Sequence, residues 1–111
     1  MAKREIIKIK KILITLLQER GIHVEKIVVF GSFAKGKINK DSDIDIIIVS
    51  KDFRNKDIFE RVEMTRGIHR KLIEGVMKPF DIMYYSNEEW KGSHSLIINA
   101  AKKEGEIVYA R

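Results

Sequence analysis

Two aspartates separated by one residue open an apolar run at positions 43–49, Asp-Ile-Asp-Ile-Ile-Ile-Val. The β-branched residues favour a strand, whose side-chain period of two places Asp43 and Asp45 on one face, about 6.7 Å apart at their Cα atoms. Two like charges held side by side favour a cation between them, and oxygen ligands select a hard ion. The pattern therefore predicts a site for Mg²⁺ or Mn²⁺ at the start of this strand.

A Gly-Ser turn precedes the acidic pair. Residues 28–30, Val-Val-Phe, are predicted to form a strand that ends at Gly31, where the missing Cβ lets the backbone turn sharply and approach a bulky anion. Ser32 then opens a short helical turn, which Gly36 closes. The free N–H groups at a helix start carry partial positive charge and, together with a serine hydroxyl, suit phosphate oxygens. This segment therefore predicts a phosphate-binding turn.

A third carboxylate lies in another apolar run, Lys-Pro-Phe-Asp-Ile-Met-Tyr-Tyr at positions 78–85. The run is predicted to be a strand, with Pro79 tolerated at its first position. An aspartate buried in such a strand is costly unless it is paired, hydrogen-bonded or metal-bound, so Asp81 is predicted to join the metal centre. The alternative is an aspartate that caps the strand or forms a salt bridge. One of Tyr84 and Tyr85 is expected to face inward.

The order of these motifs resembles that of the minimal nucleotidyltransferase (MNT) domains of the DNA polymerase β superfamily, the type found as antitoxins in HEPN/MNT toxin–antitoxin pairs. The residues that carry the resemblance are Gly31, Ser32, Gly36, Ser42, Asp43, Asp45 and Asp81. Residues 100–109 are similar to the helix, glycine and short strand that close this family, so the resemblance covers nearly the whole chain. It implies an α/β nucleotidyltransferase fold of the polymerase β type, with a mixed sheet and flanking helices.

The resemblance also implies a chemistry: a nucleoside monophosphate, AMP from ATP, is transferred to a hydroxyl of a partner protein with two Mg²⁺ or Mn²⁺ ions. The Asp-x-Asp pair would hold both ions, while Asp81 would bind the ion on the acceptor side and could take up the acceptor's proton. The nucleotide would be bound by Gly31, Ser32, Gly36 and Ser42. The implied partner is a HEPN-type RNase toxin with a tyrosine as the acceptor.

Two other functions compete with this one. A non-catalytic antitoxin would neutralise a HEPN-type RNase by binding alone. Nucleic-acid binding rests only on the net charge of +6 and the pI near 9.6, without an interleaved aromatic platform or a recognition-helix signal, so the sequence does not favour it. Larger transferases of the superfamily add a helical domain that this chain lacks, so we expect the partner to complete the acceptor site. The base preference and the oligomeric state, including a homo-oligomer, stay open.

Composition limits the class of protein. A chain of 111 residues predicts one minimal nucleotidyltransferase domain over residues 1–111, and the lack of cysteine excludes disulfides and thiolate metal sites. No apolar stretch has membrane length, which predicts a cytoplasmic protein without membrane contact. The histidines His23, His69 and His94 lack metal-ligand spacing and are expected at the surface or on helices, outside the site.

Helical periodicity and capping residues predict the elements that surround the site. The expected helices are one over residues 1–20, one from Asn55 or Asp57 to Gly75, a short one with Trp90 opened by a capping box at 86–89, and one from Ser93 or Ser95 to Gly105.

Overall fold

The computed structural model describes residues 3–30, 43–92 and 95–111. Its elements, in chain order, are α1 (Lys3–Glu19), β1 (Lys26–Phe30), β2 (Ile44–Val49), the 3₁₀ turn η1 (Lys51–Phe53), α2 (Ile58–Met64), α3 (Ile68–Val76), β3 (Phe80–Tyr85), α4 (Asn87–Gly92), α5 (Leu96–Glu104) and β4 (Glu106–Ala110). The four residues predicted to bind the nucleotide, Gly31, Ser32, Gly36 and Ser42, lie outside the described residues, as does His94.

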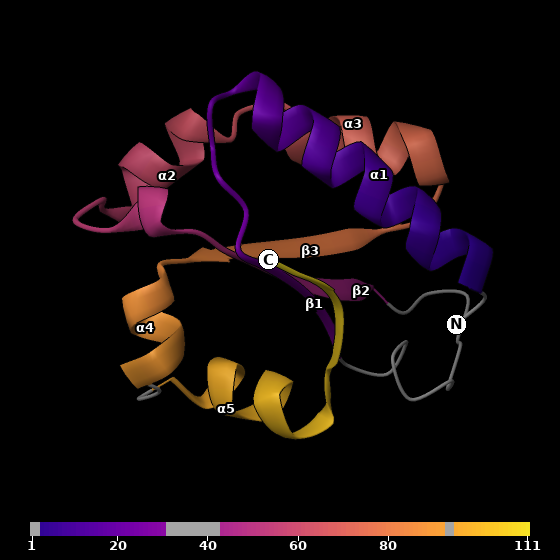
Figure 1. Ribbon diagram of the computed structural model, residues 1–111. Coiled ribbons are helices and arrows are strands. Elements are labelled where there is room, and N and C mark those ends of the chain that lie inside the picture. The colour runs from indigo at the N-terminus through magenta and orange to yellow at the C-terminus, as the bar shows by residue number, and fades with distance from the viewer. Residues whose placement is uncertain (1–2, 31–42, 93–94) are drawn as a thin grey trace.

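The four strands form one mixed sheet in the order β3-β2-β1-β4. β2 and β3 run parallel, whereas β1 is antiparallel to both β2 and β4. Helices α1, α2 and α3 lie on one face of the sheet, and α4 and α5 lie on the other (Figure 1). This architecture confirms the predicted α/β fold with a mixed sheet and flanking helices.

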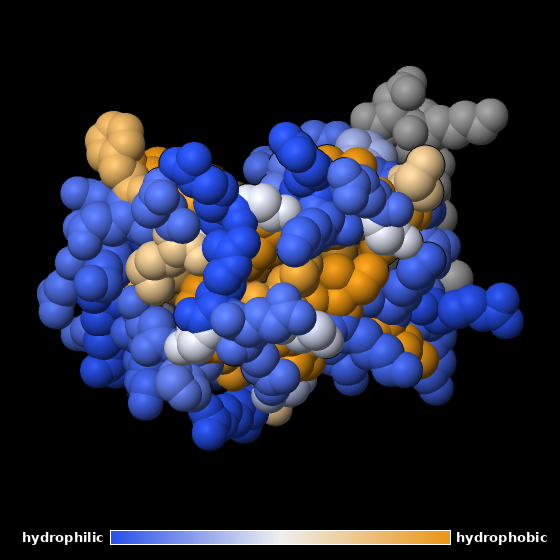
Figure 2. All heavy atoms as spheres, turned by 90° about the horizontal axis from the view of Figure 1, so that it is seen from above, coloured by the Kyte–Doolittle hydropathy of each residue, from blue (hydrophilic) through white to orange (hydrophobic). Residues whose placement is uncertain are grey.

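The central strand β2 divides its side chains between two hydrophobic clusters. Ile44, Ile46 and Ile48 pack in the larger cluster with residues of α1 and α3, whereas Ile47 and Val49 pack with residues of α4 and α5. The predicted period of two therefore describes this strand, and its odd-numbered residues face α4 and α5. On the opposite side, apolar side chains are visible in a hollow between the hydrophilic surfaces of the helices (Figure 2).

Local capping sets the starts of three helices. The Asp57 carboxylate accepts the Glu60 N–H at 2.8 Å and the Glu60 carboxylate accepts the Asp57 N–H at 3.2 Å, so this helix begins after Asp57 rather than Asn55. The predicted box at 86–89 is present, with bonds of 3.1 and 2.8 Å between Ser86 and Glu89. The last helix is capped by the Ser95 side chain. These caps each satisfy N–H groups that a helix start leaves free.

The prediction of one continuous helix up to Gly75 is wrong, because α2 ends at Met64 and a separate helix, α3, begins at Ile68. Gly67 adopts a φ of 84°, which a helix interior does not allow. The Arg20 guanidinium, at the end of α1, donates to the carbonyls of Met64 and Arg66 and so satisfies the end of α2. The break at Gly67 is thus accompanied by a long-range contact from Arg20, which helical periodicity does not reveal.

Within the described ranges, no helix is long and apolar enough to cross a membrane.

Candidate functional site

Parallel pairing brings two of the predicted aspartates together. In the register between β2 and β3, Asp45 lies opposite Asp81, and neighbouring strands are about 4.8 Å apart. The residues that flank Asp81, Phe80 and Ile82, pack into the α1/α3 cluster, so Asp81 projects toward the α4/α5 face, as Asp45 does. Asp43 lies two residues before Asp45, just outside the strand. Asp45 and Asp81 therefore project from one face at the same end of the sheet, and Asp43 directly precedes this end of β2.

The neighbouring strand on the other side of β2 leads into the Gly-Ser segment. Phe30, the last residue of β1, pairs with Asp45 across the antiparallel ladder. In the sequence Gly31 follows Phe30 directly. The segment predicted to bind phosphate is therefore joined to the sheet beside Asp45.

The electrostatics of Asp45 show that the three acids share one environment. Partial burial raises the pKa of the Asp45 carboxyl, and the negative charges of Asp81 and then Asp43 raise it further. Among the described residues, both charged groups that shift this pKa are negative, and such a group of charges favours a cation.

The expectation that Asp81 would be buried is wrong, because its side chain is exposed. β3 is an edge strand, so only one of its neighbours is another strand. Apolar flanking residues report which face of a strand is buried, but they do not report its position at the edge of a sheet. Because solvent reaches the Asp81 carboxylate, its charge needs no protein partner. The assignment of Asp81 to the candidate site therefore rests on its position opposite Asp45 in the strand register.

The aspartates suit a hard divalent cation by their chemistry, since carboxylate oxygens are the ligands that Mg²⁺ and Mn²⁺ prefer. Among residues 3–30, 43–92 and 95–111, however, no three acidic or histidine side chains converge into a group that could hold a metal ion. The donor set thus fits the ions by type and by strand position, while the side chains of the described residues do not form a closed cage.

The two histidines of the described chain have structural contacts. His23 donates its backbone N–H to the Asp52 carboxylate at 2.6 Å, and its ring Nδ1 lies 3.1 Å from the same oxygen. The Nε2 atom of His69 lies 2.6 Å from the carbonyl oxygen of Phe80. Neither belongs to the group of three aspartates.

Of the two tyrosines on β3, Tyr84 packs into the α1/α3 cluster, where its ring meets Phe53 edge-on with the centroids 5.4 Å apart. Burial raises the pKa of Tyr84 to about 12, although a hydrogen bond to Thr65 partly offsets this rise. Tyr85 is half-buried against the α4/α5 cluster. Tyr84 thus faces the larger core, as expected for one of the pair.

A family model described as "nucleotidyltransferase domain" matches residues 6–108. The chain belongs to this family. Its fold, with paired carboxylates at one end of a mixed sheet, is therefore that of a nucleotidyltransferase domain, which places the protein among enzymes that transfer nucleotides. No curated protein sequence matches the chain.

Solved structures share the fold at low sequence identity. A chain from a toxin–antitoxin complex with AMP-PNP is 20% identical, with a TM-score of 0.65 over 92% of this chain and 73% of that one. A candidate nucleotidyltransferase from Sulfolobus solfataricus is 22% identical, with a TM-score of 0.58 and coverage of 97% and 86%. A chain from a complex of tri-AMPylated Shewanella oneidensis HEPN toxin with MNT antitoxin is 19% identical. Its TM-score is 0.58, and the match covers 96% of this chain and 73% of that one.

Proposed function

We propose that this domain transfers AMP from ATP to a hydroxyl of a partner protein, in a reaction that requires Mg²⁺ or Mn²⁺, as the antitoxin of a HEPN/MNT toxin–antitoxin pair. The observation that carries the proposal is the register that sets Asp45 opposite Asp81, with Asp43 two residues away. The strand beside them leads into the Gly-Ser segment. Carboxylates next to a phosphate-binding turn are what nucleotidyl transfer requires.

In this reaction the acceptor hydroxyl oxygen forms a bond to the α-phosphorus of ATP while the bond from that phosphorus to the bridging oxygen breaks, and pyrophosphate leaves. Asp43 and Asp45 would hold the metal ions. Asp81 would bind the ion on the acceptor side and accept the proton of the acceptor hydroxyl. When bound, the ions neutralise the phosphate charge and favour deprotonation of the hydroxyl. Ser32, with Gly31, would grip the triphosphate through N–H groups and its hydroxyl.

Gly36 and Ser42 complete the proposed nucleotide-binding set. Their role rests on the sequence motif, in which a second glycine ends the turn and a serine precedes the acidic pair.

The structural neighbours support the choice of donor and partner. One is a toxin–antitoxin complex with an ATP analogue, and another contains a HEPN toxin that carries AMP together with an MNT antitoxin. Their identities of 20% and 19% support a common fold, so the transfer of AMP by this chain is our inference from the fold and the three aspartates together.

The test is to incubate the protein with Mg²⁺, ATP and a co-expressed HEPN-type partner and to measure the partner's intact mass. Each transferred AMP should add about 329 Da, because pyrophosphate is the leaving group. Asp45→Asn should abolish the shift. Asp57→Asn is the matched control, since asparagine caps a helix as well as aspartate does and this residue lies outside the site.

Two outcomes would contradict the proposal. A mass shift that persists in Asp45→Asn would remove the aspartates from the reaction. A partner that is neutralised by the wild-type protein without any gain of mass would show a binding antitoxin rather than a transferase.

A further inference from the structure

Two clefts that share lining residues lie along the outer edge of β3, between that strand and α2, and we treat them together as one groove. Its first part, about 450 Å³, is bounded by Arg61 and Glu89 at one end, and its second part, about 440 Å³, is bounded by His69 and Asp81 at the other. The side chains that line both parts are Val62, Ile82 and Tyr84. The groove thus extends along β3 from the α4 end of the strand to the proposed catalytic end.

The backbone groups of β3 point alternately to its two edges. The carbonyls of Pro79 and Tyr85 accept N–H groups from Ile44 and from Ser50, on the β2 side, each at 3.0 Å. The carbonyls of the even-numbered residues 80, 82 and 84 must therefore point to the outer edge. The backbone of this edge strand consequently faces the groove.

Side chains cover two of these three outward carbonyls. His69 Nε2 lies 2.6 Å from the Phe80 oxygen, and the Arg61 guanidinium donates to the Tyr84 oxygen at 3.0 Å. The carbonyl of Ile82 lies between those of Phe80 and Tyr84 and also points outward. Among the described residues, none donates a hydrogen bond to it. Proteins commonly block edge strands to prevent pairing with other chains, and here the block leaves one gap.

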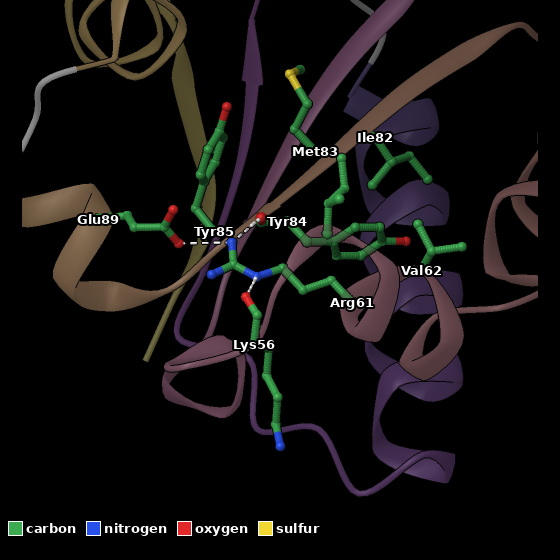
Figure 3. Close-up of a pocket in the computed structure, with 9 residues that line it drawn as sticks. Lys56, Arg61, Val62, Ile82, Met83, Tyr84, Tyr85 and Glu89 are labelled. Atoms are coloured by element: carbon green, nitrogen blue, oxygen red, sulfur yellow. Dashed lines mark hydrogen bonds and ion pairs between the residues drawn. The ribbon is translucent and has the colours of Figure 1, made fainter.

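Arg61 forms the fixed end of the groove. Its guanidinium also donates to the carbonyls of Lys56 at 3.0 Å and Phe53 at 2.9 Å, and it pairs with the Glu89 carboxylate at 2.7 Å. Figure 3 shows the contacts of Arg61 with Lys56, Tyr84 and Glu89, and the side chains of Val62, Ile82 and Tyr84 lie together on one side of its guanidinium. The helical periodicity of the sequence did not predict these contacts of Arg61.

The rim of the groove is apolar and exposed. α2 buries none of its residues, and Ile58 and Val62 are 71% and 58% exposed although both line the cleft. The adjacent Phe59 is 81% exposed. Neighbouring apolar side chains of this size at the surface are typical of binding sites. The groove is thus suited to an apolar ligand.

We infer that this groove binds the acceptor segment of the partner protein as a short extended chain with apolar side chains on both sides of its hydroxyl residue. An extended chain can use the Ile82 backbone groups, whereas a helix has its own backbone groups satisfied internally. From Tyr85 to Asp81 the strand spans about 13 Å, enough for four or five extended residues. The inference rests on the proposed function, because Asp81, the residue assigned to the acceptor, lines the second part of the groove. Its side chain projects toward the α4/α5 face, and an extended chain alongside β3 presents alternate side chains to that face.

The test uses two fluorescein-labelled peptides that share a central tyrosine, one flanked by two valines on each side and one flanked by lysine and glutamate. Binding is measured by fluorescence anisotropy without ATP. We expect the valine peptide to bind about ten-fold more tightly or better. Val62→Glu should remove this preference, whereas Ile107→Glu should keep it. Ile107 is a matched control because it is 53% exposed and lies on β4, the opposite edge of the sheet.

Hydrogen exchange monitored by NMR tests the extended pairing directly. The valine peptide should slow exchange of the Ile82 amide, which points to the outer edge with its carbonyl. Unchanged exchange, or equal affinity for the two peptides, would overturn the inference. So would a dimer in sedimentation that Val62→Glu dissociates, since a second copy of the chain would then occupy the groove.

Addition of Mg²⁺ and ATP separates this inference from the proposed function. A valine peptide that binds in the groove but gains no AMP would support the groove and contradict the transferase. A peptide that gains AMP equally in wild type and Val62→Glu would support the transferase and overturn the groove.

Discussion

Replacement of Asp45 by asparagine should stabilise the metal-free protein while removing its function. Asp45 lies opposite Asp81 on neighbouring parallel strands, and its pKa is raised by partial burial and by the charges of Asp81 and Asp43. Asparagine is nearly isosteric with aspartate and keeps a side-chain oxygen, so the main change is the loss of one negative charge from a group of three.

The strand spacing sets the size of this effect. Two unit charges about 5 Å apart repel by about 0.8 kcal/mol in water and about 3 kcal/mol at an effective dielectric constant of 20. Because Asp81 is exposed and Asp45 is only half-buried, solvent screening keeps the value near the lower limit. We therefore expect Asp45→Asn to raise the free energy of unfolding by about 1 kcal/mol in EDTA.

Urea unfolding followed by circular dichroism measures this change. Asp57→Asn, which keeps its helix cap, should leave the free energy of unfolding unchanged. Adding Mg²⁺ with a non-hydrolysable ATP analogue should reverse the order, since a ligand that binds only the folded state at 100 times its Kd stabilises it by about 2.7 kcal/mol. If Asp45→Asn lowers stability in EDTA, the three aspartates do not repel one another and the electrostatic reasoning is wrong.

Other parts of the molecule give further predictions. Arg61→Ala should lower the free energy of unfolding by about 3 to 5 kcal/mol, because two half-buried carbonyls lose a charged donor, whereas Arg66→Ala, at a 74% exposed side chain, should cost under about 0.5 kcal/mol in the same urea assay. Partial burial would raise the pKa values of Asp52 and Glu89, but the hydrogen bonds to these carboxylates outweigh it and lower both pKa values. Thermal melts at a series of pH values should therefore show stability falling as the pH drops below their ordinary values of 3.8 and 4.5, and a constant melting temperature there would contradict these bonds. Ser32→Ala should weaken ATP binding by about 0.5 to 1.5 kcal/mol in titration calorimetry but AMP binding less, and equal affinities for ATP in the two proteins would remove Ser32 from the phosphate turn.

Patterns that depend on near neighbours in the sequence predicted the structure well. The β-branched run after Asp43 forms a strand because its side chains alternate between two apolar clusters. The capping box predicted at Ser86 is present, because it needs residues only three positions apart. The same alternation predicted that Asp45 would project away from Ile44, and the structure places it there.

Features that depend on distant parts of the chain could not be predicted in this way. At the break between α2 and α3, the carbonyls of Met64 and Arg66 accept hydrogen bonds from Arg20, which directly follows α1. The exposure of Asp81 follows from the position of β3 at the sheet edge, which is decided by strand order rather than by flanking residues. Arg61 lines one end of the groove between β3 and α2, and its partners come from η1, β3 and α4 as well as from the preceding turn.

Titration calorimetry with ATP tests the central claim, that the aspartates at the paired ends of β2 and β3 form a metal-dependent nucleotide site. In Mg²⁺ the wild-type protein should bind ATP, and in EDTA the binding should be lost. The double variant Asp43→Asn with Asp45→Asn should bind no ATP in Mg²⁺. Its unfolding midpoint should lie at a urea concentration at least as high as that of the wild type. ATP binding that persists unchanged in this folded double variant would contradict the account.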